Sequence, residues 1–84
     1  MTSSRFMWLV VAGRGHASEQ RGLTDDLDNA KARVNEHAER FRRKGRTDWF
    51  GFVLDLDRPT VIMPPGRTQP IFGWERVYFV DGRG

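Results

Sequence analysis

The stretch WFGFVLDLD, residues 49–57, decides the fold that this sequence predicts. Side chains alternate between the two sides of a strand, so Trp49 and Val53 point to one side while Phe50 and Phe52 point to the other. Large apolar groups on both sides indicate a strand inside a sheet, with something packed on each face. The rest of the chain must therefore supply cover for two faces.

One predicted helix can pack on one of these faces. It begins after an N-cap at Thr24 or Asp25 and ends at Gly45. Its apolar positions recur every three or four residues and form a single stripe. The stripe consists of Leu27, Ala30, Val34, Ala38 and Phe41. Acidic residues at the start of the helix and basic residues at its end both suit the helix dipole. A stripe of this width packs against one surface only.

The other predicted strands flank this helix in the sequence. Apolar alternation predicts strands over 5–12 and 71–80, and three glycines mark residues 13–22 as a loop. Four prolines between positions 59 and 70 exclude a helix there, because proline lacks the amide hydrogen that a helix needs. We expect only a short edge strand at 61–63, since proline is tolerated at the edge of a sheet.

These elements predict a single α+β domain over residues 1–84, with 1–4 and 81–84 as loose ends. One helix packs on one face of a mainly antiparallel sheet of three or four strands, in the order strand, helix, strand, short strand, strand. Short connections around the helix favour parallel first and second strands, with the last strand returning antiparallel between them.

The second face of this sheet is predicted to stay apolar and uncovered. A monomer seldom exposes a contiguous apolar patch above a few hundred Å², and larger patches mark interfaces. We expect this face to meet a protein partner or a second copy of the chain through the candidates Met7, Leu9, Val11, Trp49, Val53, Val77 and Phe79. The alternative is that the proline-rich segment, residues 59–70, folds back over the face as a lid.

A basic cluster at the end of the helix offers a second kind of binding site. Five positive charges fall within seven residues, with no acidic residue among them: Arg40, Arg42, Arg43, Lys44 and Arg46. With Trp49 close behind, the cluster predicts contacts to phosphate or single-stranded nucleic acid. The same charges also suit the negative end of the helix dipole, so both interpretations stay open.

The segment FGFV, residues 50–53, resembles the signature strand of RNA-recognition-motif domains over these four residues. The basic residue and glycine that precede this signature are replaced by Asp48 and Trp49, and the proline-rich segment cannot form the second helix of that fold. The sequence is therefore not assigned to the family. What the resemblance implies is that Phe50 and Phe52, where exposed, stack on bases.

No motif for catalysis, a cofactor or a metal stands out. The chain has no cysteine, which excludes disulfides and thiolate chemistry. The segment GRGHAS, residues 13–18, lacks the third glycine and the immediate helix of a dinucleotide fingerprint. His16 and His37 have no spacing that pairs them, and turn formation explains Asp55 and Asp57. We therefore expect no enzyme activity, no cofactor and no metal.

The predicted function is that of a small, non-catalytic interaction module that binds a protein or itself. A compact chain of this kind also suits an accessory or inhibitor protein of a phage or other mobile element. The formal net charge of +3 is small for a duplex binder, so nucleic-acid binding through residues 40–46 is the alternative. The longest apolar run, residues 6–12, is far shorter than the roughly 20 residues of a membrane helix, so we expect no membrane partner. The lack of cysteine suits a reducing compartment, so we expect a cytoplasmic protein.

Overall fold

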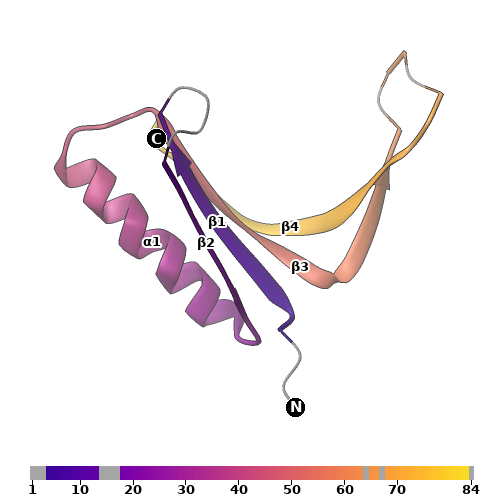
Figure 1. Cartoon of the computed structure of the whole chain (residues 1–84), viewed down its shortest axis with the longest axis horizontal. Coiled ribbons are helices and arrows are strands. Elements are labelled where there is room, and N and C mark those ends of the chain that lie inside the picture. The colour runs from indigo at the N-terminus through magenta and orange to yellow at the C-terminus, as the bar shows by residue number, and fades with distance from the viewer. Residues whose placement is uncertain (1–3, 14–17, 64, 67, 84) are drawn as a thin grey trace.

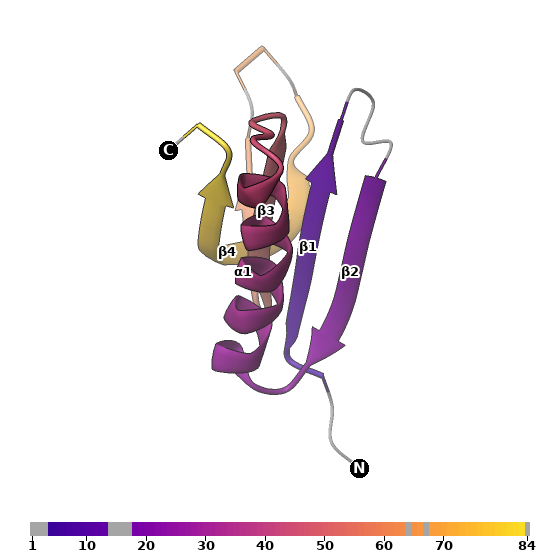
Figure 2. The same cartoon turned by 90° about the vertical axis from the view of Figure 1, so that its left-hand side faces the viewer.

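The computed structural model describes residues 4–13, 18–63, 65–66 and 68–83. Within these residues the order of elements is β1 (Phe6–Ala12), β2 (Ser18–Thr24), α1 (Leu27–Arg43), β3 (Trp49–Ile62) and β4 (Ile71–Asp81). All neighbouring strands pair antiparallel, in the order β2-β1-β3-β4 (Figure 1). The helix crosses one face of the sheet, as Figure 2 shows. The α+β class, the single helix and the antiparallel sheet are as the sequence predicts.

Strand β2 corrects the prediction of a loop at residues 13–22. Its residues pair with β1 from Phe6 opposite Thr24 to Ala12 opposite Ser18. It is an edge strand whose first four residues are all exposed and polar, so it lacks the apolar alternation by which a strand is recognised. The extra strand reverses the chain before the helix, and β1 and β3 therefore run antiparallel instead of parallel.

Strands β3 and β4 also differ from the prediction. Val61 belongs to the 14-residue strand β3, with no separate edge strand at 61–63, and β4 lies outside β3 instead of between β1 and β3. The first residue of β1, Phe6, lies opposite Asp55, so beyond Asp55 strand β3 has a strand partner on one side only. Pro59 is tolerated there because the missing amide hydrogen leaves no second partner unsatisfied.

The helix is confirmed, with a small shift at its start. Asp26 is the N-cap, and its side chain accepts a hydrogen bond of 3.0 Å from the amide of Asp28. At the other end Lys44 is the C-cap, and Gly45 has φ of +69°, a conformation that favours glycine. The middle of the predicted stripe, Ala30, Val34 and Ala38, is fully buried.

The core lies between α1 and the sheet, and Gly51 sets their spacing. Phe6, Val10 and Val53 pack against the helix stripe. A Cβ built on Gly51 would lie 2.8 Å from Cγ1 of Val34 and 3.1 Å from Cγ2 of Val10. Non-bonded carbon atoms pack best at about 3.5–4.0 Å, so only glycine lets the helix approach this closely.

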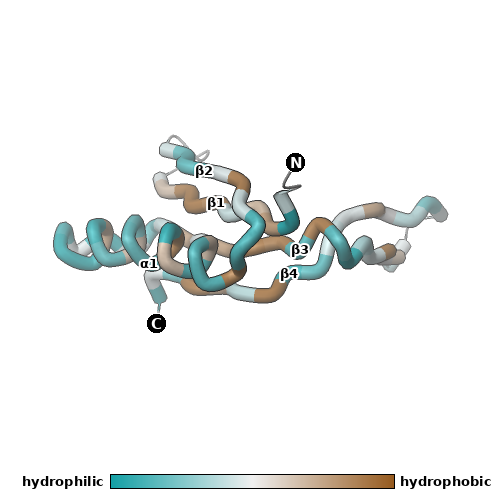
Figure 3. The backbone as a smooth tube through the Cα atoms, turned by 90° about the horizontal axis from the view of Figure 1, so that it is seen from below, coloured by the Kyte–Doolittle hydropathy of each residue, from teal (hydrophilic) through white to brown (hydrophobic). Residues whose placement is uncertain are grey.

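Beyond the start of β1, strands β3 and β4 continue as a two-stranded arm. We define the arm as the described residues between 59 and 74, with paired positions from Pro59 opposite Trp74 to Ile62 opposite Ile71. It bends away from the rest of the sheet, which we call the body, and stands apart from the helix (Figures 1 and 3). The radius of gyration is 14.3 Å, whereas a compact domain of this length has about 12 Å.

We predict that Gly51→Ala destabilises the protein, because the new methyl group overlaps Val34 under the helix. Overpacking of this kind reduces the free energy of unfolding by about 1–3 kcal/mol, measured by urea denaturation. The matched control is Gly73→Ala in β4, where an added Cβ meets no atom within 4 Å. The control should stay within about 0.5 kcal/mol of the parent. Equal stability of the two variants would contradict the close approach at residue 51.

Candidate interaction surface

The sheet face opposite α1 carries a continuous set of large apolar side chains. Phe6, Trp8 and Val10 pack toward the helix, so the alternate residues of β1 point away from it. The strand register places the neighbours from β3 and β4 beside them. We call this set the apolar face, and it consists of Met7, Leu9, Val11, Phe50, Phe52, Leu54 and Phe79. Among the described residues no helix or strand packs on this side.

Three phenylalanines pack against one another on the apolar face. The ring centroids of Phe50 and Phe52 are 6.2 Å apart, and those of Phe50 and Phe79 are 6.4 Å apart. The guanidinium of Arg76 lies 4.4 Å from the ring centroid of Phe79. Val11 is only 2% exposed, whereas Phe79 remains 43% exposed. The face is therefore buried at Val11 and open to solvent at Phe79.

Four of the seven residues predicted for the uncovered face lie on it: Met7, Leu9, Val11 and Phe79. The structure places the other three on the helix side, with Trp49 and Val53 in the core at 3% and 0% exposure and Val77 packed against that core. The sequence alone did not fix the register of β1 against β3, and the prediction matched the wrong side of β3 to Met7. A bulge opposite Val53 moves Val77 to the helix side.

Sequence reasoning left Phe50, Phe52 and Leu54 out of this surface, although the alternation in β3 was plain. Choosing between the two sides required the register of β1 against β3, in which Phe52 lies opposite Leu9 and Phe50 opposite Val11. One signal in the sequence pointed to the right side. Gly51 stands between Trp49 and Val53, and a glycine inside a strand marks the close approach of another segment.

The apolar surface continues from the body onto the arm. Because the bulge uses an extra residue of β4, the side chains that follow Phe79 on its side are Arg76, Trp74 and Phe72. Val61 lies opposite Phe72 and shares that side. Phe72, Trp74 and Val61 are 75%, 48% and 59% exposed. The alternative in which residues 59–70 cover the face as a lid does not hold for the described part, which extends away in the arm (Figure 1).

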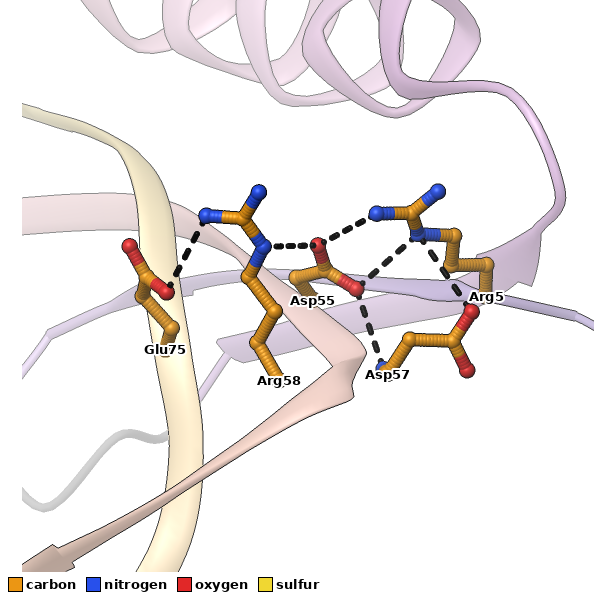
Figure 4. Close-up of polar contacts among 5 residues, drawn as sticks. All are labelled: Arg5, Asp55, Asp57, Arg58 and Glu75. Atoms are coloured by element: carbon orange, nitrogen blue, oxygen red, sulfur yellow. Dashed lines mark hydrogen bonds and ion pairs between the residues drawn. The ribbon is translucent and has the colours of Figure 1, made fainter.

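A network of charged side chains lies where the arm leaves the body (Figure 4). Asp55 is 2% exposed and accepts two hydrogen bonds from Arg5, of 3.1 and 3.0 Å, and one of 3.0 Å from the amide of Asp57. Arg58 lies 3.6 Å from Asp55 and 3.5 Å from Glu75 of β4. The network joins the chain before β1 to both strands of the bend, and it leaves Asp55 and Asp57 in ion pairs with Arg5.

The Arg5 hydrogen bond is the main cause that holds the pKa of Asp55 below its ordinary value, and burial opposes it.

The basic cluster predicted for nucleic acid does come together at the C-terminal end of α1. Four of its five side chains have acidic partners: Arg40 with Glu36, Arg42 and Arg43 with Glu39, and Arg46 with Asp48. Trp49 is buried, and its indole N–H donates to the carbonyl of Arg46 at 3.0 Å. Its ring therefore has no face open to a base.

Two shallow hollows border the apolar face. One, of about 400 Å³, lies at the end of the sheet and is lined by Thr47, Asp48, Trp49, Phe50, Phe79, Asp81 and Arg83. The other, of about 360 Å³, is lined by Met7, Arg21, Gly22 and Leu23.

Within the described ranges no three potential metal ligands come together. His37 stacks on Trp8 with ring centroids 5.5 Å apart, and His16 lies outside the described residues.

Comparison with protein-family models, with curated proteins and with solved structures finds no match to this chain. No helix in the described part of the chain has both the length and the apolar character needed to cross a membrane.

We predict that the Asp55 network makes stability depend on pH. A carboxyl group whose pKa is lowered by folding contributes stability above its unfolded pKa of about 4, and this contribution disappears as the pH falls through the folded pKa. Asp55→Asn should therefore unfold more easily than the parent at pH 7, and the difference should shrink below about pH 4. Urea denaturation between pH 7 and pH 2 measures it.

The control for this prediction is Asp57→Asn, which removes the more exposed partner of Arg5. Its effect should be small at every pH, because exposed ion pairs contribute little. A difference between parent and Asp55→Asn that stays constant down to pH 2 would show that the Asp55 charge does not stabilise the fold.

Proposed function

We propose that this chain is a non-catalytic interaction module that binds a protein through its apolar face. The observation that supports the proposal is the packed group of Phe50, Phe52 and Phe79 on a sheet face with no covering element among the described residues. Aromatic side chains with exposed edges are the residues that dominate binding energy at protein interfaces. Methionine and leucine beside them complete an apolar surface that adapts to a partner.

The magnitude of the hydrophobic effect supports this function. Each Å² of apolar surface removed from water contributes about 25 cal/mol, so a patch of some 600 Å² gives on the order of 15 kcal/mol before the costs of association. A patch of about 600 Å² approaches the ~800 Å² that each partner of a standard interface buries. Arg76 beside Phe79 and Arg21 opposite Leu9 give the face a mixed polar rim, as binding surfaces have.

The experiment compares Phe79→Glu with the parent in capture of proteins from an extract of the native host. Phe79 is half-exposed, so the charge enters the face without disturbing the core. Capture through the apolar face should fall at least about tenfold, because the substitution replaces a half-exposed apolar ring with a carboxylate that must lose its water in the contact. The control Ala32→Glu adds the same charge on the exposed side of α1 and should bind as the parent does. Equal capture by parent and Phe79→Glu would refute the proposal.

A second candidate function is nucleic-acid binding at residues 40–46. One observation favours it: five basic side chains lie together at one end of α1, and Lys44 has no acidic partner within the described residues. The three neighbouring acids, Glu36, Glu39 and Asp48, compensate most of this charge. Any binding should therefore be weak and should fall steeply with salt.

The test of the second candidate is retention on immobilised oligonucleotide over a salt gradient. If the cluster binds phosphate, the triple variant Arg42→Gln, Arg43→Gln, Arg46→Gln should elute at clearly lower salt than the parent. Arg33→Gln, on the same helix but outside the cluster, is the control and should elute with the parent. Elution of the triple variant at the same salt as the parent would remove this function.

A further inference from the structure

We propose that the partner of the apolar face is a second copy of this chain, whose arm enters the open angle between body and arm. The inference rests on the proposed function, because it names the occupant of the same face. In the complex, two chains interlock about a two-fold axis, and each inserts its arm against the apolar face of the other. The apolar face of each chain is then covered by the arm of the other chain.

The first argument is the amount of surface that a single chain leaves in solvent. The chain exposes 6236 Å². A folded monomer of 9.7 kDa exposes about 5,100 Å². The excess of about 1,100 Å² is close to the area that one partner of a stable complex buries. The arm stands away from the body, and this accounts both for the excess exposed area and for the large radius of gyration.

The second argument is the composition of the arm. A two-stranded hairpin without a third strand or a packed helix is only marginally stable in water. Natural proteins protect such exposed strands with charged residues, but the 16 residues of 59–74 contain one charge, Arg67, in a chain with 30% charged residues. Its exposed side chains instead include Phe72, Trp74 and Val61. This composition suits a segment that is buried in the functional assembly.

The third argument is that one chain carries both halves of the contact. The arm presents apolar side chains, and the body presents an apolar face on the same side of the sheet, so two chains satisfy each other in a closed pair. At roughly 200 Å² for a large aromatic, the exposed fractions of Phe72, Trp74 and Phe79 amount to about 330 Å². These three residues alone supply about two fifths of the ~800 Å² that each partner of a standard interface buries.

An unrelated partner fits the arm less well. Arg67 is the single charge in the sequence of the arm, so an acidic or a basic partner would gain little from contact with the arm. The exposed aromatics of the arm lie on the same side of the sheet as the phenylalanines of the body. An arm with one charge and several aromatics therefore matches the apolar face of the same chain.

The experiment measures the mass of the whole chain in solution by light scattering over a range of concentrations. The parent should have twice the mass of one 9.7 kDa chain. Phe72→Glu in the arm and Phe79→Glu in the apolar face should each be monomeric, and Ala32→Glu should remain a dimer. Phe72 is 75% exposed, so its variant should keep the fold of the parent, which far-UV circular dichroism checks.

Mixing the two monomeric variants gives the decisive result. In the interlocked pair, the arm of the Phe79→Glu chain and the face of the Phe72→Glu chain are both intact, so one of the two arm-to-face contacts forms again. The mixture should therefore contain a species of dimer mass that neither variant forms alone. Without this restored contact the two variants should not associate, because each has gained a negative charge and like charges repel.

Three outcomes would overturn the inference. A parent that is monomeric at every concentration excludes the second copy. A dimer that survives Phe72→Glu, or a mixture that stays monomeric, excludes docking of the arm on the face. In each case the proposed function is judged separately, by whether Phe79→Glu reduces capture of a host protein. The failure of the inference and the failure of the function are therefore distinguishable.

Discussion

The packing of one helix on one side of the sheet, close over Gly51, determines the layout of this molecule. Gly51 brings α1 within contact of the sheet, and the helix stripe fills the space between β1 and β3. A helix is about 10 Å wide with its side chains, so it shields one side of a four-stranded sheet and no more. Everything on the other side follows from this limit. The apolar face remains without a covering element in the described part of the chain, and the phenylalanines there contact one another.

The charged network at the bend decides how that face is extended. Without Arg5 and Arg58 on either side, the carboxylate of Asp55 would be a buried charge without a partner, which is strongly unfavourable. Its bonds instead tie the start of β1, the middle of β3 and β4 together at the point where the arm departs. The arm thus has a defined direction relative to the body, and the apolar surface keeps one continuous shape over both.

The sequence predicted the parts of the fold that depend on local pattern. The helix, its cap region and its buried stripe are visible as a periodic run, and the double alternation of residues 49–54 correctly indicated a central strand. Strand β2 could not be found in this way, because Ser18 to Arg21 are polar and the strand is held by its partner alone. Missing it reversed the expected direction of β3 relative to β1. The register of β1 against β3 also cannot be read from the sequence, and Trp49 and Val53 were therefore assigned to the face that Phe50 and Phe52 occupy.

The polar edge formed by β2 has a consequence for how copies of this chain can assemble. Open backbone groups along the outer strand of a sheet invite a neighbour to add another strand, and repetition of that step gives an endless fibre. Here the first four residues of this edge are exposed and include Glu19 and Arg21, whose charges would have to be dehydrated in such a step. Addition of a strand at this edge is thereby discouraged, and the proposed contact through the apolar face would give a closed pair of chains instead of a fibre.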